Sequence, residues 1–334
     1  MLKINNQNEL VEGKFVGKNI DKIIIGPDIK YIPENCFNNC KNLNEITFEG
    51  NINNIEAAAF MGCENLRIIN ANNINVIKDF AFHGCNNIVN FNIDENIANN
   101  IKYGSYNNSL STYFELPEIE TPFNDLSWRK INLISKKGKA KEYFNVGDEK
   151  ELQIGSETYH VQILGFAHDD KSDGTGKAGI TVGLKEIMTT TSKMNSTNTN
   201  VGGWEDSKMR TYLNDTVYNS LPQEVKDIIK PVNKKTSEGN YSTNITTTSD
   251  KLFLLSEVEI FGSTTWSASG EGSQYQYFAD GGSKIKYQTG SSNYWWERSP
   301  NVGYTYYFCS VSDYGGASGS NANNAFGVVF GFSI

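Results

Sequence analysis

The sequence lacks the residue patterns that mark most catalytic and metal-binding proteins. It contains three histidines and five cysteines among 334 residues. No histidine stands in a recognisable motif with a serine or cysteine, which argues against a hydrolase triad. The odd number of cysteines, four of them between residues 36 and 85, forms neither a dense disulfide framework nor a close set of metal ligands. We therefore predict no enzyme activity, no cofactor and no metal site.

Long apolar runs and basic clusters are also missing. Residues 1–6 lack the hydrophobic segment of a secretory signal, and no stretch is long enough to span a bilayer. The net charge is −8. The nearest approach to a basic cluster, Lys136–Lys141, is better explained as a solvated helix end than as a nucleic-acid surface. The sequence predicts no signal peptide, no membrane span and no nucleic-acid partner.

The chain has globular composition, and its length suits two domains. Its N-terminal part repeats one pattern, marked by Phe37, Phe60 and Phe82, each followed by a cysteine and then by leucine or isoleucine. In the first repeat, residues 43–48 place Leu, Ile and Phe on the inner side of a short strand, with Phe37 on the return arm. One such unit cannot bury its apolar face alone, so neighbouring units must stack.

Residues 59–66 (AFMGCENL) and 81–88 (AFHGCNNI) resemble the BspA-type leucine-rich repeat of bacterial surface antigens. The first repeat departs from the pattern, with Cys36 in place of Ala and Asn39 in place of Gly. The resemblance implies a short, right-handed leucine-rich-repeat solenoid of the α/β class over residues 1–98, caps included. Family members commonly mediate adhesion, but the repeat itself implies only a scaffold, so a spacer role and a binding role both stay open.

Residues 99–125 break the period and are polar and turn-rich, which indicates an end cap and linker. We expect a helix next, capped by Asn124 or Asp125, with Trp128, Ile131 and Ile134 on one face. It opens a second domain, residues 126–334. Its expected elements are a strand over 158–166, a helix burying Met209 and Leu213, a helix from Pro222 to before Pro231, a buried strand over 251–255, and a capping box over Ser256–Glu259.

The last forty residues alternate apolar or small anchors with polar residues and tyrosines. The residue types Tyr, Ser, Asn, Gly and Asp are typical of paratopes, where Tyr gives rigid contact area and the small polar residues give adaptable hydrogen bonds. Two exposed strands with ordinary polar faces would explain the composition equally well. The candidate ligand-binding residues are Tyr304, Thr305, Tyr306, Tyr307, Ser310, Ser312, Asp313, Tyr314, Ser318, Ser320, Asn321, Asn323, Asn324 and Trp295.

Four segments, 202–214, 251–262, 295–300 and 327–330, resemble a bacterial family known as DUF6273. That family is similar to C-type-lectin-like domains, including the variable proteins of diversity-generating retroelements. The resemblance implies an α+β C-type-lectin-like fold that displays a diversified set of Tyr, Asn, Ser, Asp and Gly between Tyr304 and Asn324. The same scaffold carries formylglycine-generating enzymes, but their cysteine pair is missing because only Cys309 lies in this domain.

The sequence therefore predicts a recognition protein that binds a protein or receptor ligand on another cell or surface. A carbohydrate-binding adhesin and a structural surface protein without a specific ligand are the alternatives. We expect a cell-surface, secreted or virion-associated location. Trp296 is expected in the core, Trp295 stays open, and Glu297 is expected in a buried salt bridge near Arg298. We interpret residues 168–174 as a turn with capping aspartates rather than a calcium loop, and His160 as structural.

Overall fold

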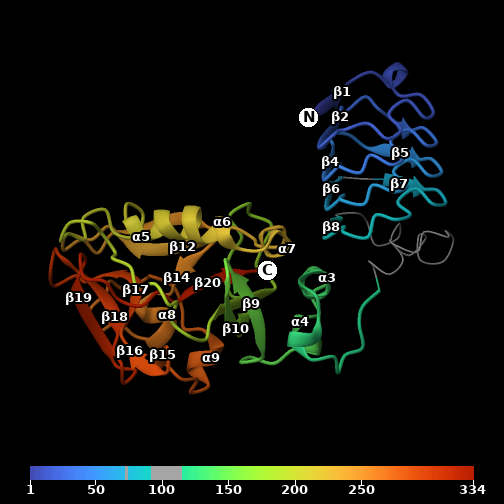
Figure 1. Ribbon diagram of the computed structural model, residues 1–334. Coiled ribbons are helices and arrows are strands. Elements are labelled where there is room, and N and C mark those ends of the chain that lie inside the picture. The colour runs from blue at the N-terminus through green and yellow to red at the C-terminus, as the bar shows by residue number, and fades with distance from the viewer. Residues whose placement is uncertain (72–73, 92–114) are drawn as a thin grey trace. The chain divides into compact units, whose positions relative to one another are not determined.

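A computed structural model describes residues 1–71, 74–91 and 115–334 (Figure 1). The chain divides into two compact units, unit 1 with residues 1–117 and unit 2 with residues 118–334. This division falls within the predicted linker 99–125, most of which lies outside the described residues. Each unit has its own core and is described separately below.

Unit 1 is a solenoid of stacked turns with a parallel sheet along each of two sides (Figure 1). Ile23, Ile46 and Ile69 occupy equivalent places on successive strands and are paired in register. The first sheet contains β1 (Leu2–Ile4), β2 (Lys22–Ile25), β4 (Glu45–Phe48), β6 (Ile68–Asn70) and β8 (Asn90–Phe91), in that order. The second contains β3 (Tyr31–Ile32), β5 (Ile52–Ile55) and β7 (Ile74–Ile77). The leucine-rich-repeat solenoid predicted from the repeats is confirmed.

Stacked aromatic rings run through the centre of this solenoid. The rings of Phe15, Phe37, Phe60 and Phe82 lie 5.0 to 5.2 Å from one another along the stack and are nearly parallel. The cysteine of each repeat is buried beside them, and the thiol of Cys63 donates to the carbonyl of Phe37 at 3.2 Å. We expected a solenoid of the α/β class, and that part of the prediction was wrong for the described residues of unit 1. They include one short 3-10 helix, η1 (Gln7–Glu9), and no α-helix, and a second parallel sheet stands where an α/β repeat would place helices.

The main sheet of unit 2 is antiparallel and closes on the last strand of the chain. Its order is β14-β20-β11-β10-β9. The strands are β9 (Glu149–Ile154), β10 (Glu157–Phe166), β11 (Ile180–Leu184), β14 (Phe253–Leu254) and β20 (Phe330–Ser333). The predicted strand over 158–166 is confirmed as β10, and the predicted strand over 251–255 is confirmed in its centre as β14. Strand β20 lies between β11 and β14, so residues far apart in sequence complete one sheet (Figure 1).

The helix predicted near residue 125 forms, but another residue caps it. Helix α3 (Trp128–Lys136) buries Trp128, Ile131 and Ile134 as expected, and Ser127 accepts the capping hydrogen bond from the amide of Lys130. Asn124 cannot serve as the cap because its side chain accepts a hydrogen bond from the amide of Glu151 on β9, and its backbone belongs to the 3-10 turn η2 (Phe123–Asp125). The hydrogen bond from β9 thus occupies the side chain of Asn124, and Ser127 caps the helix instead.

Short helices and hairpins make up the rest of unit 2. The helices are α4 (Ala140–Tyr143), α5 (Lys208–Tyr212), the π-helical η3 (Leu213–Val217), α6 (Tyr218–Ser220), α7 (Gln223–Lys226), α8 (Glu257–Phe261) and α9 (Gln276–Ala279). Two hairpins join β12 (Val232–Ser237) to β13 (Ile245–Asp250) and β15 (Lys286–Gln288) to β16 (Ser291–Asn293). The predicted capping box of α8 is confirmed, with Ser256 and Glu259 satisfying each other's backbone amides. No helix in the described part of the chain has the length and apolar character needed to cross a membrane.

The candidate ligand-binding residues lie on and around a separate three-stranded sheet. Its strands are β17 (Trp295–Pro300), β18 (Tyr307–Val311) and β19 (Ala317–Asn321), in that order, all antiparallel. Strand β18 is the middle strand and β19 is an edge strand. This order decides which of the predicted residues reach the surface.

Candidate recognition surface

Most of the predicted binding residues are exposed or half-buried, and they form two groups at opposite ends of the β18–β19 hairpin. The first group surrounds Tyr304–Tyr307 and the end of β19, and the second is the hairpin turn at Asp313 and Tyr314. Five-residue strands separate the two groups by ~15 Å. We call the exposed and half-buried set the tail face: Tyr304, Thr305, Tyr306, Tyr307, Asp313, Tyr314, Ser318, Ser320, Asn321, Asn323 and Asn324.

Trp295, Ser310 and Ser312 do not belong to this surface, because all three are 0% exposed. Ser310 and Trp295 lie on β18 and β17, which are covered on both faces. The indole of Trp295 donates to the backbone carbonyl of Lys284 at 3.0 Å. Ser312 accepts a hydrogen bond from the amide of Gly316 and so fixes the hairpin turn. The alternation of apolar and polar residues along the sequence does not show that β18 is the middle strand of its sheet.

Three tyrosines at one end of the hairpin pack against one another. The ring of Tyr304 lies 5.6 Å from that of Tyr306 and 5.0 Å from that of Tyr307, and Tyr306 meets Tyr307 edge to face at 5.0 Å. Tyr304 is 45% exposed and Tyr306 is 36% exposed. Mutual packing restricts the rings while leaving aromatic surface in contact with solvent. Tyr314, at the other end, is 73% exposed and forms a separate aromatic contact point.

A buried side chain holds the backbone beneath these tyrosines. Asn200 is fully buried, and its Nδ2 lies 2.7 Å from the carbonyl oxygen of Tyr304 and 2.8 Å from that of Tyr307. Its own amide donates to Thr305, and its Oδ1 accepts from the amide of Asn240. Asn200 therefore joins the backbone of residues 304–307 to its own loop and to the loop that contains Asn240, both of which are distant in sequence. Sequence reasoning missed it, because one asparagine within the polar stretch 195–200 carries no distinguishing signal.

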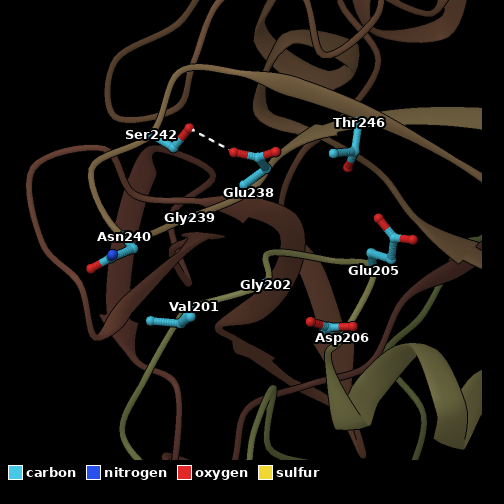
Figure 2. A pocket seen from close by; sticks show the side chains of 9 residues that line it. All are labelled: Val201, Gly202, Glu205, Asp206, Glu238, Gly239, Asn240, Ser242 and Thr246. Carbon is cyan, nitrogen blue, oxygen red and sulfur yellow. Dashed lines mark hydrogen bonds between the residues drawn. The ribbon is translucent and has the colours of Figure 1, made fainter.

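An acidic pocket lies beside this asparagine. Its volume is about 390 Å³. Val201 and Asn240, which adjoin or contact Asn200, are part of its wall. Figure 2 shows the lining residues Val201, Gly202, Glu205, Asp206, Glu238, Gly239, Asn240, Ser242 and Thr246. Three carboxylates from two loops surround the opening, and Ser242 donates to Glu238 at 3.1 Å (Figure 2). No sequence pattern indicated this pocket, because its two halves lie more than thirty residues apart.

A network of charged residues is buried behind the surface. Arg298 pairs with Glu259 at 2.9 Å, and Lys234 contacts both Glu259 and Asp169 at 2.8 and 2.7 Å. Lys234 and the other charged groups are nearly inaccessible, and opposite charges compensate one another. Lys234 and Arg298 hold the pKa of Glu259 below its usual range against the effect of burial. These ion pairs join β12, α8 and β17.

Glu297 was expected in this buried ion pair, and that prediction was wrong. Its carboxylate oxygens are buried and have no hydrogen-bond partner among the described residues, whereas Arg298 points to Glu259. Burial, with Glu257 and Glu271 nearby, raises the pKa of Glu297 well above its ordinary value. Burial therefore favours the un-ionised form of this carboxyl more than it would in an exposed glutamate. Trp296, expected in the core, is fully buried and stacks on Phe326.

The acidic stretch near His168 forms a turn, as predicted. Asp173 accepts hydrogen bonds from the amide and hydroxyl of Thr175, and Asp170 pairs with Lys177 at 3.0 Å. Asp169 points inward to the charged network. His160 on β10 contacts Glu186 at 2.8 Å. Within the described residues, no group of three or more His, Cys, Asp or Glu side chains is placed to hold a metal ion.

Two family models match separate parts of the chain. Residues 8–133 match the BspA type Leucine rich repeat region in six copies, a match that extends into helix α3 of unit 2. Residues 179–334 match the Domain of unknown function (DUF6273), which covers the β17–β19 sheet and the pocket. Neither a curated protein nor a solved structure shows significant similarity to the chain. The chain thus combines a BspA type leucine-rich-repeat region with a DUF6273 domain.

Proposed function

We propose that unit 2 is a non-enzymatic recognition domain that binds a protein or receptor ligand through the tail face, and that unit 1 is the spacer that presents it. The observation that carries this proposal is the cluster of Tyr304, Tyr306 and Tyr307, two of which are solvent-exposed and one half-buried, on a backbone held by Asn200. A cell-surface, secreted or virion-associated location suits such a protein.

The physical argument concerns the entropy of binding. Tyrosine offers a large amphipathic contact surface with few rotatable bonds, and clusters of tyrosine dominate many recognition surfaces. The rings of the cluster restrict one another, and Asn200 fixes their backbone. A ligand therefore meets groups that are already ordered, which lowers the entropic cost of association. Ordinary solvent-facing strands do not require such support.

We further propose that unit 2 is C-type-lectin-like and that its tail face is diversified between related genes. The support is the burial pattern of the segment: Phe308, Val311 and Ala322 are buried, while Tyr314, Ser318 and Asn321, between Val311 and Ala322, are exposed or half-buried. A scaffold can keep the first set and vary the second without losing its core. Sister copies of the gene in one genome test this. Substitutions spread evenly over unit 2, rather than concentrated in the tail face, would contradict it.

A glycan is the second candidate ligand. The acidic pocket of Figure 2 favours it, because carboxylates and hydroxyls in a concave site next to exposed tyrosines can hydrogen-bond and stack against a sugar. A structural surface protein with no specific ligand is the remaining alternative. These possibilities predict different partners and can be separated in one experiment.

The experiment compares the full chain with a variant carrying Tyr304→Ala, Tyr306→Ala and Tyr314→Ala. Both are applied to an array of protein ectodomains and to a glycan array. The matched control carries Tyr241→Ala and Tyr287→Ala, two tyrosines of unit 2 that are 61% and 55% exposed outside the tail face. We expect a protein partner whose binding the first variant loses at least tenfold and the control retains. Equal binding by all three proteins would exclude the tail face, and binding only on the glycan array would support the adhesin.

A further inference from the structure

Strand β19 is an edge strand of its sheet. It pairs with β18 on one side, and no other strand within the described residues pairs with it. In Figure 1 it lies at the margin of unit 2, beyond β17 and β18. All five of its residues are partly exposed. A free edge of this kind presents a row of hydrogen-bonding groups that another extended chain can use.

The register identifies which groups are free. Ser312 donates to Gly316 and Ala322 donates to Tyr306, so the hydrogen-bonded pairs of the hairpin are those that contain Ser318 and Ser320. The intervening residues, Ala317, Gly319 and Asn321, therefore direct their N–H and C=O groups away from β18. Within the described part of the chain, only the carbonyl of Asn321 among these groups has a hydrogen-bond partner, the amide of Asn324 in the following turn.

Nothing on the strand protects this edge. Proteins usually guard an edge with charged residues, proline or a bulge. The sequence Ala-Ser-Gly-Ser-Asn contains neither charge nor proline, and its five pairs with β18 run without a break in register. The contrast within the same unit is clear, because the edge strand β9 carries Glu149, Lys150 and Glu151. The edge of β9 thus carries charged residues, whereas the edge of β19 carries none.

The surroundings of β19 suit a peptide rather than a compact ligand. The tyrosine cluster lies at one end of the strand, where Tyr307 pairs with Asn321, and Tyr314 lies beyond the other end. Only an extended backbone supplies donors and acceptors at the two-residue spacing of Ala317, Gly319 and Asn321. Its side chains would reach the tyrosines at both ends.

We propose that the ligand of the tail face is an extended segment of a partner protein, which adds to the β17–β18–β19 sheet as a fourth strand beside β19. This inference rests on the proposed recognition role of the tail face and names the chemistry of the partner. Backbone hydrogen bonds supply an affinity that is independent of ligand sequence. The tail-face side chains supply selectivity, so diversification can change the partner without changing the mode of binding.

The probe is a seven-residue peptide selected from a random display library on the full chain, then synthesised with N-methyl groups at alternating residues. We expect methylation of one alternating set to weaken binding at least tenfold and methylation of the other set to have little effect. Hydrogen exchange gives a second readout. The amides of Ala317, Gly319 and Asn321 should exchange quickly in the free protein and become protected by the peptide, whereas those of Ser318 and Ser320 stay protected throughout.

Protein variants complete the test. Ala317→Pro removes one outward amide and should weaken the peptide at least tenfold, while protection of Ser318 and Ser320 shows that the hairpin persists. If that variant does not fold, Ala317→Lys adds an edge charge and should have a similar effect. Failure to select a peptide, or binding that tolerates both methylation sets, would overturn the inference. A dimer abolished by Ala317→Pro would also overturn it, with a second copy as the occupant.

The inference can fail while the proposed function stands. In that case the triple tyrosine variant loses the partner found on the ectodomain array, but Ala317→Pro and Ala317→Lys retain it. If the tyrosine variant retains its partner, the proposed function fails first. The two sets of variants therefore report on different claims.

Discussion

At the scale of single residues, departures from the repeat pattern have local explanations. Asn39 stands where Gly62 and Gly84 stand in the following repeats, and all three residues have positive φ, 56°, 70° and 80°. Asparagine tolerates this left-handed conformation better than other residues with a side chain. A side chain at Gly62 would instead meet the Oδ1 of Asn39, 2.3 Å from its Cβ. The backbone geometry thus accommodates asparagine in the first repeat, whereas a side chain at Gly62 would require the side chain of Asn39 to move.

Asn200 should be the residue on which the order of the tail face depends most. Asn200→Ala removes a buried donor from the carbonyls of Tyr304, Tyr307 and Asn301; the carbonyl of Tyr307 keeps its bond from the amide of Asn301. We expect a loss on the order of 3 kcal/mol in the free energy of unfolding, measured with urea. Asn198→Ala, which removes one exposed bond to Asn321, is the matched control and should cost less than about 0.5 kcal/mol. Equal losses in both variants would contradict the role of Asn200.

The buried carboxyl of Glu271 should make unit 2 less stable as the pH rises. Burial raises its pKa from 4.5 to about 7, against hydrogen bonds from Ser299 and Ser237. Between these values the folded protein holds a proton that the unfolded chain has lost. The contribution of protonated Glu271 to the free energy of unfolding is therefore complete below pH 4.5 and is lost as the pH approaches 7. At ~1.4 kcal/mol per pKa unit, the change across this window is on the order of 3 kcal/mol.

Comparison with Glu271→Gln isolates this effect. His168, whose pKa burial lowers, acts in the opposite direction below pH 6.5 in both proteins, so it cancels in the difference. Urea unfolding at pH 5 and pH 7.5 should show a smaller decline for the variant than for the wild type. Glu205→Gln, at an exposed position, should leave the decline unchanged. A decline of the same size in Glu271→Gln would show that the carboxyl is not the source.

At the scale of elements, the sequence predicts best where a local pattern and the final packing agree. The spacing of Phe37, Phe60 and Phe82 predicted the solenoid because each repeat contacts only its neighbours. Strand β10 and the capping box of α8 were predicted correctly because short, local sequence patterns determine both. The helix cap was misplaced because the side chain of Asn124 binds β9. Trp295 was wrongly included among the candidate ligand-binding residues because its burial depends on sheet order. The acidic pocket and Asn200 unite distant loops, which no local pattern reports.

The aromatic stack should make the central turn of the solenoid more sensitive than its end. Phe60 is fully buried between Phe37 and Phe82, whereas Phe15 is half-buried and stacks on one side. Phe60→Ala should reduce the free energy of unfolding of unit 1 by about 3–5 kcal/mol. Phe15→Ala should cost about half as much, because less surface and one ring contact are lost. Thermal unfolding of the isolated residues 1–117 measures both, and equal losses would argue against a continuous stack.

At the scale of the whole molecule, the last strand of the chain completes the main sheet of unit 2. Strand β20 lies between β11 and β14, and its residues Phe330 and Phe332 are buried. Ser135 of α3 also donates to the carbonyl of Ile334, so the first helix and the last residue of the unit are joined. The sheet that carries the tail face is also joined to this C-terminal segment, because Trp296 of β17 donates its backbone amide to the carbonyl of Gly327.

We therefore expect residues 118–334 to fold without unit 1 but not without β20. A fragment of residues 118–334 should unfold cooperatively in urea and retain near-ultraviolet circular dichroism from its buried tryptophans, since its core and charged network come from within the unit. A fragment of residues 118–326 loses the strand that joins β14 to β11, and should lack both signals. Phe332→Ala in the longer fragment provides an intermediate, with a loss of about 3–5 kcal/mol. If the shorter fragment unfolds cooperatively, the central position of β20 is not what holds the sheet together. If neither fragment folds, unit 2 requires residues of unit 1.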